Sequence, residues 1–323
     1  MLGYLQALGL SFRGKNLIFN GTITQKGGPS ATSGTWYLVD ANSGLDTHDG
    51  LTWPTAMKTM TEAFTRVASG DTIVFRGKIR EQLVAPVQVF DVTIIGAGNR
   101  PRHADSTPAG GELAAATWTT PTVEDADAPL LKVMQQGWSF YNFLVAGPSA
   151  AACFQLYRDA GSGNAERDSS HSEFGGIRFA SGYNGIHDTG GCFNVKVAGC
   201  RFQAFTNYCM LGVGNIGAGQ GMWEVLGNQF NGFTNGVKMA FYESIIRDNY
   251  FTAGGTPGTT VVLNTVNAIY GSNFVVDNWF QTTTANFNTP DIVGNATDVW
   301  RNYSIDGSDL SSASIGLELG QPA

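Results

Sequence analysis

Asp248 and Asp277 are the residues that come nearest to an acid pair able to cleave a glycosidic bond. Such catalysis uses two carboxyl groups ~5–5.5 Å or ~6.5–9.5 Å apart. Both aspartates hold the same position of a repeat described below, and equivalent positions on stacked strands lie about 4.8 Å apart. Gly199, Gly227 and Arg301 fill that position in other repeats. We therefore interpret the two aspartates as turn-forming residues and keep catalysis as the alternative.

The loop that begins at residue 40 offers a second kind of chemistry. Its Asp40, Asp46 and Asp49 carry carboxylate oxygens of the kind that bind Ca²⁺. The loop lacks the spacing and the glutamate of an EF-hand, so we favour a polar turn. A lyase would also need a base, and Arg247 beside Asp248 is the nearest candidate. The sequence thus predicts no cofactor, and Ca²⁺ is the one ion with candidate ligands.

Four aromatic residues flank the inward positions of the repeats, and we expect them to point outward if the alternation of a strand holds. They are Trp223, Tyr242, Tyr250 and Trp279. Exposed aromatic rings can stack on sugar rings or pack against another subunit. Because the repeats carry little charge, we favour subunit packing over sugar binding.

These residues lie in a repeat whose pattern is an apolar residue, any residue, Gly or Asp, Asn, any residue and Phe. Four segments fit it and a fifth fits loosely: Val197–Phe202, Val225–Phe230, Ile246–Phe251, Val275–Phe280 and Val299–Ser304. The four Phe residues are 28, 21 and 29 positions apart. Spacings of this size are typical of solenoids in which each repeat forms one coil.

Each element of the repeat predicts a structural role. Apolar and polar residues alternate, which indicates a strand with one buried face. Asn tolerates the left-handed backbone conformation, so we expect it to bend the chain between two strands. Stacked coils would then form two columns of side chains. These are a turn ladder of Asn228, Asn249, Asn278 and Asn302 and a core stack of Phe202, Phe230, Phe251 and Phe280.

The composition agrees with a solenoid of strands. Charged residues make up only 14% of the chain, which argues against a helical bundle. The 42 glycines suit short strands joined by tight turns. We predict an all-β fold, namely a right-handed single-stranded parallel β-helix with an N-terminal capping helix. Coils of about 25 residues would number roughly nine.

Charge and hydropathy exclude some partners. The formal net charge is −7, and nucleic acid is disfavoured because phosphate binding needs clustered Lys and Arg. No apolar stretch approaches the ~20 residues of a membrane span, so no membrane insertion is expected. Residues 1–12 are apolar but lack the positive start of a signal peptide. The four cysteines have no metal-ligand spacing and are interpreted as core residues.

We divide the chain into four parts. They are an attachment segment and linker at 1–35, a strand, loop and capping helix at 36–70, the parallel β-helix at 71–307 and a tail at 308–323. The helix is predicted at 55–69 from its apolar spacing, with Pro54 at its start and Gly70 just past its end. Such an amphipathic helix would cover the open end of the solenoid.

Residues 36–81 run from the strand WYLVD through the loop ANSGLDTHDG to GDTIVF and GKIRE. This stretch resembles the opening of the right-handed β-helix superfamily that includes pectate lyases and phage tailspikes. The resemblance implies the fold. It implies little about function, because lyases, hydrolases, adhesins and inert virion proteins share that fold. The sequence departs from the usual pattern at Ile79, where Tyr is expected.

Our first hypothesis is a virion structural protein, similar to a tailspike or another particle appendage. It would form a homotrimer, contact other virion proteins and touch host-surface glycans, and its location would be the virion. The alternative is a polysaccharide lyase or glycoside hydrolase acting on a bacterial polysaccharide, which would be secreted. We lean away from an enzyme because the repeat's most regular residues look architectural. A bacterial surface adhesin is a third possibility.

Overall fold

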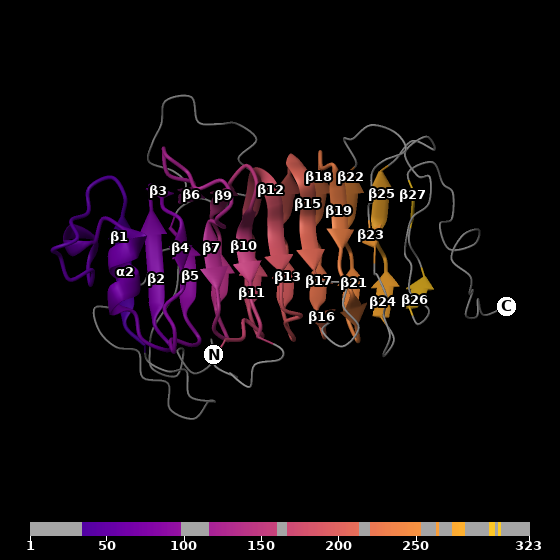
Figure 1. Ribbon diagram of the computed structural model, residues 1–323, viewed down its shortest axis with the longest axis horizontal. Coiled ribbons are helices and arrows are strands. Elements are labelled where there is room, and N and C mark those ends of the chain that lie inside the picture. Colours follow the sequence, from indigo (N-terminus) through magenta and orange to yellow (C-terminus); the bar gives the residue numbers. More distant parts are fainter. Residues whose placement is uncertain are drawn as a thin grey trace, which may run out of the picture. The chain divides into compact units, whose positions relative to one another are not determined.

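The computed structural model describes residues 34–97, 116–159, 167–212, 220–252, 263–264, 273–281, 297–300 and 303–304. Most of the predicted attachment segment and all of the tail lie outside these residues. The described chain is almost entirely strand, and neighbouring strands run parallel. Figure 1 shows successive strands stacked in chain order.

The coils of the described residues are built from three parallel sheets. Sheet A contains, in order, β1 (Trp36–Asp40), β2 (Thr72–Arg76), β5 (Thr93–Gly96), β8 (Ser139–Tyr141), β11 (Glu173–Gly175), β13 (Lys196–Ala198), β17 (Glu224–Leu226), β21 (Ile245–Arg247), β24 (Asn273–Val276) and β26 (Thr297–Trp300). Sheet B contains β3 (Lys78–Arg80), β6 (Thr117–Thr119), β9 (Leu144–Ala146), the first part of β12 (Arg178–Asp188), β14 (Arg201–Gln203), β18 (Gln229–Asn231), β22 (Tyr250–Thr252), β25 (Trp279–Gln281) and β27 (Tyr303–Ser304). Sheet C contains β4 (Leu83–Val84), β7 (Leu131–Val133), β10 (Ala152–Leu156), the second part of β12, β15 (Phe205–Gly212), β19 (Asn235–Lys238) and β23 (Leu263–Asn264).

One coil passes through the three sheets in turn. For example, the chain runs from β17 in sheet A to β18 in sheet B and β19 in sheet C. A separate pair, β16 (Gln220–Gly221) and β20 (Phe241–Tyr242), lies outside this pattern. From β2 to β26, sheet A holds nine strands, which matches the predicted number of coils. Strand β1 pairs with β2 and adds a tenth, so residues 36–40 belong to the sheet.

The predicted aromatic stack is present in the core. Phe202 and Phe230 lie face to face with ring centroids 5.0 Å apart, and Phe230 and Phe251 with centroids 4.6 Å apart. Phe179 extends the column by one coil at 4.4 Å from Phe202. Each aromatic pair contributes about 0.5–1.5 kcal/mol beyond the burial of its surface. Phe280 pairs with Phe251 through the backbone, and its side chain lies outside the described structure.

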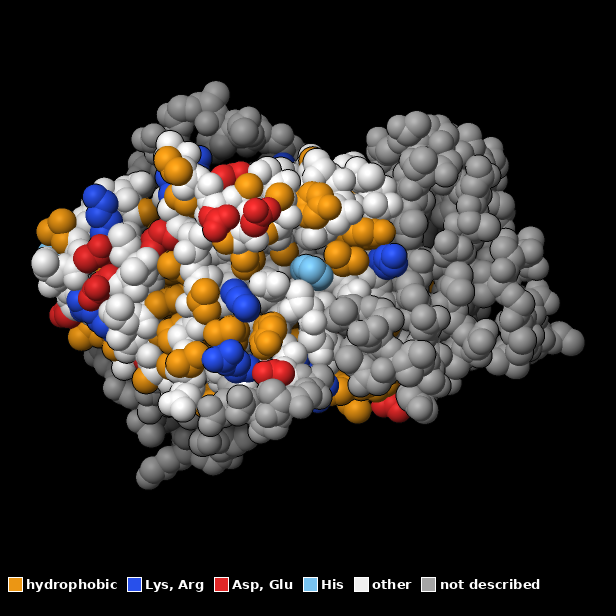
Figure 2. All heavy atoms as spheres, in the orientation of Figure 1, with side chains coloured by type: hydrophobic (Ala, Val, Ile, Leu, Met, Phe, Trp, Pro, Cys, Tyr) orange, Lys and Arg blue, Asp and Glu red, His pale blue; other side chains and the backbone are white. Residues whose placement is uncertain are grey.

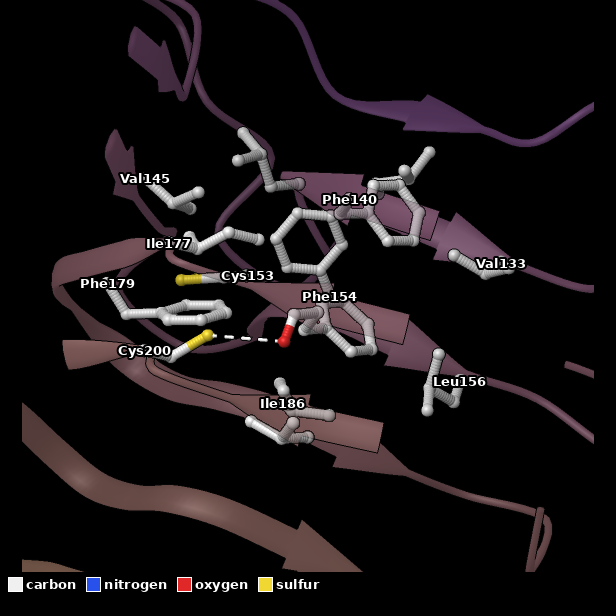
Figure 3. Close-up of a cluster of buried hydrophobic side chains, with 14 of the residues drawn as sticks. Val133, Phe140, Val145, Cys153, Phe154, Leu156, Ile177, Phe179, Ile186 and Cys200 are labelled. Atoms are coloured by element: carbon white, nitrogen blue, oxygen red, sulfur yellow. Dashed lines mark hydrogen bonds between the residues drawn. The ribbon is translucent and has the colours of Figure 1, made fainter. Parts of the chain in front are cut away.

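The rest of the core is equally apolar. Figure 3 shows Phe140 and Phe154 packed together, with Cys153 and Cys200 among the same buried side chains. The centroids of the two Phe rings are 4.9 Å apart. All four cysteines are free and buried, as predicted. Burial raises the pKa of the Cys153 thiol well above its usual range, so this side chain behaves as a packing residue.

The asparagine ladder is present at Asn228, Asn249 and Asn278, all fully buried. The side-chain oxygen of each accepts the backbone N–H one coil earlier, with N···O distances of 2.8, 2.9 and 3.0 Å. The side-chain nitrogens of Asn228 and Asn249 donate to the amide oxygen of the next Asn. The ladder therefore satisfies buried backbone groups between coils. Asn302 lies outside the described residues.

The backbone role predicted for these asparagines is wrong. The left-handed residue is the one before each Asn: Gly227 has φ 59°, Asp248 has φ 58° and Asp277 has φ 55°. Gly or Asp at this position turns the chain, because these residues tolerate positive φ. The Asn that follows then points inward and forms the ladder.

The predicted helix is shorter than 55–69. A 3-10 helix, η1 (Trp53–Thr55), holds Pro54, and Met57 then pairs with Val39 of β1. The α-helix α2 therefore begins only after its N-cap residue Thr59 and spans Met60–Arg66. Strand-like pairing at Met57 excludes a helix that starts earlier.

Helix α2 contributes to the core, and its first turn is bound by a carboxylate from later in the sequence. Met60 and Phe64 are buried, and the Phe64 ring meets Trp138 edge-on with centroids 5.6 Å apart. Glu81 accepts the backbone N–H groups of Met60 and Thr61, each at 2.8 Å. Glu81, the last residue of the GKIRE segment, thus binds N–H groups at the start of the helix that have no partner within the helix. That α2 caps the solenoid stays a prediction.

The ladder makes a stability prediction. Asn249→Ala would remove the acceptor of the Asn228 N–H and the donor to the Val225 carbonyl, leaving buried groups unpaired. We expect the free energy of unfolding to fall by about 3 kcal/mol. Asn231→Ala changes an outward, half-buried Asn that directly follows Phe230 in a neighbouring coil, and it should lower this free energy by less than about 0.5 kcal/mol. Urea unfolding measures both values. If the two variants lost the same free energy of unfolding, the proposed role of the ladder would be contradicted.

Candidate functional site

The two candidate catalytic aspartates occupy turns. Asp248 follows β21 and Asp277 follows β24, which are neighbouring strands, so the two residues lie one coil apart. Both have positive φ, and glycine takes the same conformation at Gly199 and Gly227. The Asp248 carboxylate is exposed and lies 3.0 Å from the Arg247 guanidinium. This geometry supports the turn-forming interpretation, and a catalytic role remains a prediction without a structural observation in its favour.

The candidate calcium ligands hold separate backbone groups. Asp46 accepts the N–H groups of Lys58 and Thr59 at 2.9 Å each. Asp49 accepts the Leu51 N–H and the Thr55 hydroxyl. Asp40 binds elsewhere, as described next. Among the described residues, no three His, Cys, Asp or Glu side chains form a group that could hold a metal ion.

Asp40 is a buried carboxylate with many donors. It accepts the N–H groups of Asn42 and Ser43, and Arg76 donates to it from Nε at 2.9 Å and Nη2 at 2.7 Å. Burial by itself would raise the Asp40 pKa, but the hydrogen bonds from Ser43, Arg76 and the two backbone amides outweigh it and lower the pKa to about 2. Asp40 therefore links the start of the loop, at Asn42 and Ser43, to Arg76 of β2.

Trp223 does not point outward, so its predicted contact role is wrong. Its side chain is fully buried, and the indole N–H donates to the Cys192 carbonyl at 2.7 Å. Met222, with φ 55°, turns the chain into β17. Trp223 therefore lies on the same inward side as Val225, two residues later.

Tyr242 is half-buried and packs against its own molecule. Its ring meets Phe193 edge-on with centroids 5.8 Å apart. The ring also lies against Gly221, where any side chain would clash with it. Burial raises the pKa of Tyr242. This residue offers much less free ring surface than predicted.

Tyr250 and Trp279 do lie on the outer face of sheet B. They are register partners on β22 and β25, next to the inward Phe251. Trp279 is 49% exposed and Tyr250 is half-buried. Of the four predicted contact residues, these two bring aromatic rings to neighbouring outward positions. Their function as sugar or subunit contacts remains a prediction.

Sequence reasoning missed a row of side chains on the outer face of sheet C. The backbone register aligns one residue from each of five successive strands, which we call the sheet C row: Lys132, Gln155, His187, Leu211 and Lys238. All five are half-buried, and none is acidic. Figure 2 shows the face over β7 to β19, where basic and histidine side chains lie among hydrophobic ones.

Aromatic rings support the two lysines of this row. Lys132 Nζ lies 4.7 Å from the centroid of the Tyr157 ring, and Lys238 Nζ lies 6.0 Å from that of Tyr208. Such cation–π contacts hold the ammonium groups in place without neutralising them. Four strand spacings separate the lysines, or about 19 Å along the stack. The row thus carries positive charge on a protein whose net charge is −7.

His187 lies in the middle of the row. Burial lowers its pKa, although the neighbouring Asp188 acts in the opposite direction. The imidazole is therefore neutral at pH 7 and can donate and accept hydrogen bonds. The Asp188 carboxylate is buried and accepts three backbone N–H groups, from Gly190, Gly191 and Cys192. Asp188 consequently shapes the turn, whereas His187 faces outward.

A local signal for this row exists, although it is weak. Lys132 stands between Leu131 and Val133, and Gln155 stands between Phe154 and Leu156. A single polar residue between two apolar ones indicates an outward position on a strand. The sequence contains no repeat motif in this part of each coil, and only the register between coils aligns these residues.

Comparison with known proteins bears on the fold. No protein-family model and no curated protein sequence matches the chain. Its structure is similar to that of the pectin methylesterase from Aspergillus niger in deglycosylated form. The two share 14% identity and a TM-score of 0.54, over 92% of this chain and 94% of the other. The fold is a right-handed parallel β-helix.

Two further solved structures are similar at lower scores. A pectin methylesterase from carrot shares 10% identity over 88% of this chain and 86% of its own, with a TM-score of 0.48. A pectate lyase shares 11% identity over 87% and 81%, also with a TM-score of 0.48. The similarity to the A. niger protein confirms the predicted parallel β-helix at the level of fold. Among the described residues, no helix is long and apolar enough to cross a membrane.

Asp40 generates a pH-dependent prediction. Its folded pKa of about 2 lies below the usual value near 3.9, so it stabilises the fold above pH 4 and this contribution is lost as the pH falls through 2. Between pH 5 and pH 1.5, the wild type should lose up to about 2 kcal/mol more than Asp40→Asn. Urea unfolding across this range measures the difference. If the free energy of unfolding changed with pH in the same way for both proteins, the lowered pKa of Asp40 would be contradicted.

Proposed function

We propose that this protein binds polysaccharide, and that the sheet C row binds the acidic groups of the chain. The observation that carries the proposal is the row itself, in which Lys132 and Lys238 present positive charge beside the Tyr157 and Tyr208 rings. Lysines bind carboxylate groups, and aromatic rings pack on the apolar faces of sugars. Gln155 and the neutral His187 between the lysines can bind hydroxyl groups.

The shape of the row supports a polymer as the ligand. Five outward side chains follow one another along the stack, each about 4.8 Å from the next. A linear glycan lying along the stack would meet all of them. Two lysines are too few for a nucleic acid, which needs clustered positive charge along its phosphates. The A. niger protein of the same fold is, by its name, an enzyme acting on pectin.

We further propose that the protein acts as an appendage of a virion, where glycan binding would attach the particle to a host surface. Sheet A supports assembly with other subunits. Its outward positions include the half-buried Leu38, Val74, Ile95 and Leu226, and Phe274 is 44% exposed. A row of outward apolar side chains is typical of a surface that another chain covers. The occupant that we propose is a second copy of this chain, within a homotrimer.

Salt-dependent binding tests the sheet C row. The double variant Lys132→Ala/Lys238→Ala should bind polygalacturonate about tenfold more weakly at low salt, since each ion pair contributes about 0.7 kcal/mol. Its affinity should also depend less on salt concentration. The wild type should bind the fully methyl-esterified polymer less tightly than the acid form. Isothermal titration calorimetry measures all three.

The matched control removes the same charge elsewhere. Lys58→Ala/Lys78→Ala changes two exposed lysines outside sheet C and should keep wild-type affinity. An equal loss in both double variants would mean that net charge alone acts, and would overturn the proposed site. Unchanged binding in the sheet C variant would do the same.

The trimer makes a separate prediction. Analytical ultracentrifugation should give a mass of three chains, or about three times 34.4 kDa. Phe274→Asp would replace an exposed apolar side chain next to Ile245 on sheet A by a charge and should shift the equilibrium towards monomer. Phe274 is exposed in the single chain, so the variant should retain its fold. A wild-type monomer at micromolar concentration would refute the assembly.

A further inference from the structure

Sheet B carries a group of outward side chains that the sheet C row does not include. Three neighbouring strands contribute them, and we call the group the Tyr250 strip: Gln229, Asn231, Tyr250, Thr252 and Trp279. The register pairs Gln229 with Tyr250 and Tyr250 with Trp279, and it pairs Asn231 with Thr252. The strip therefore consists of two adjacent rings beside a set of amide and hydroxyl groups.

The strip stands on a fixed backbone. The Tyr250 N–H donates to the Asn228 carbonyl at 2.8 Å, and the Trp279 N–H donates to the Asn249 carbonyl at 2.7 Å. Both carbonyls belong to residues of the buried asparagine ladder. On the inward side of the same strands, Phe230 and Phe251 are stacked face to face. A rigid support of this kind lowers the entropic cost of binding a ligand.

The chemistry of the strip differs from that of sheet A. One outward line of sheet A is apolar, as at Val74 and Leu226, and the line beside it includes the ion-paired Glu173 and Lys196. The strip instead combines aromatic rings with uncharged hydrogen-bonding groups. A pyranose ring needs this combination, because its C–H face packs on an aromatic ring while its hydroxyls bind amides and hydroxyls.

We propose that the Tyr250 strip is a second glycan site that binds uncharged pyranose units, with the sugar stacked on Trp279 and Tyr250. The proposal goes beyond the acidic-polysaccharide function of the sheet C row and does not rest on it. The five side chains of the strip carry no formal charge. Binding there should therefore be insensitive to salt, unlike binding at the sheet C row.

Affinity electrophoresis of the full chain tests this inference with three neutral polysaccharides: a mixed-linkage β-glucan, a galactomannan and dextran. At least one should retard the wild type equally at low and high salt. Trp279→Ala should weaken that retardation about fivefold, as expected for the loss of one stacked ring. Gln229→Ala, which removes an amide of the strip without touching a ring, should also weaken it.

Two matched variants separate the explanations. Trp36→Ala removes a Trp that is 61% exposed on sheet A and should bind like the wild type. Lys132→Ala/Lys238→Ala should also bind neutral glycan normally, so failure of the sheet C proposal and failure of this one are distinguishable. Circular dichroism melting confirms that each variant is folded.

Three results would overturn the inference. The first is no retardation by any of the three polymers. The second is an equal loss of binding in Trp36→Ala. The third is a change in the sedimentation mass of Trp279→Ala with unchanged glycan retardation, which would make the strip a subunit contact.

Discussion

In this protein buried asparagine amides join the successive coils between Cys200 and Asn278. The Asn249 side chain accepts the N–H of Asn228 and donates to the Val225 carbonyl, and the Asn278 side chain repeats the pattern one coil later. These bonds form only when the coils stay in register at about 4.8 Å. The face-to-face Phe column requires the same register. Every outward row described above depends on it too, because one side chain from each coil reaches a common line only if no coil slips.

The N-terminal region shows how acidic residues can serve architecture. Asp46, Asp49 and Glu81 bind backbone N–H groups or a hydroxyl of the loop and helix, and Asp40 binds Arg76 of β2. Carboxylates used in this way fix a loop of irregular backbone. The motif at 36–81 is therefore a good indicator of the fold. For the same reason it says little about chemistry.

The three sheets share one core and differ on their outer faces. Sheet A has an apolar line beside one that includes Glu173 and Lys196, sheet B bears adjacent aromatic and amide side chains, and sheet C carries lysines over tyrosine rings. A solenoid permits this division because inward positions are fixed by packing, whereas outward positions are free to vary between coils. Function on such a scaffold resides in the outward rows, and the most regular residues of the repeat do not report it.

The sequence by itself determined the coil. Its Asn and Phe positions predicted the ladder and the core stack, since a residue that recurs once per coil must stack on its equivalents. It erred on details that depend on the exact turn: Gly or Asp, and not Asn, takes the left-handed conformation, and Trp223 points inward behind Met222. Only the tertiary structure decided which residues share an outer face. Lys132 and Lys238 are 106 positions apart and follow no common motif, and they fall in one row because the lengths of the intervening loops place their strands in register.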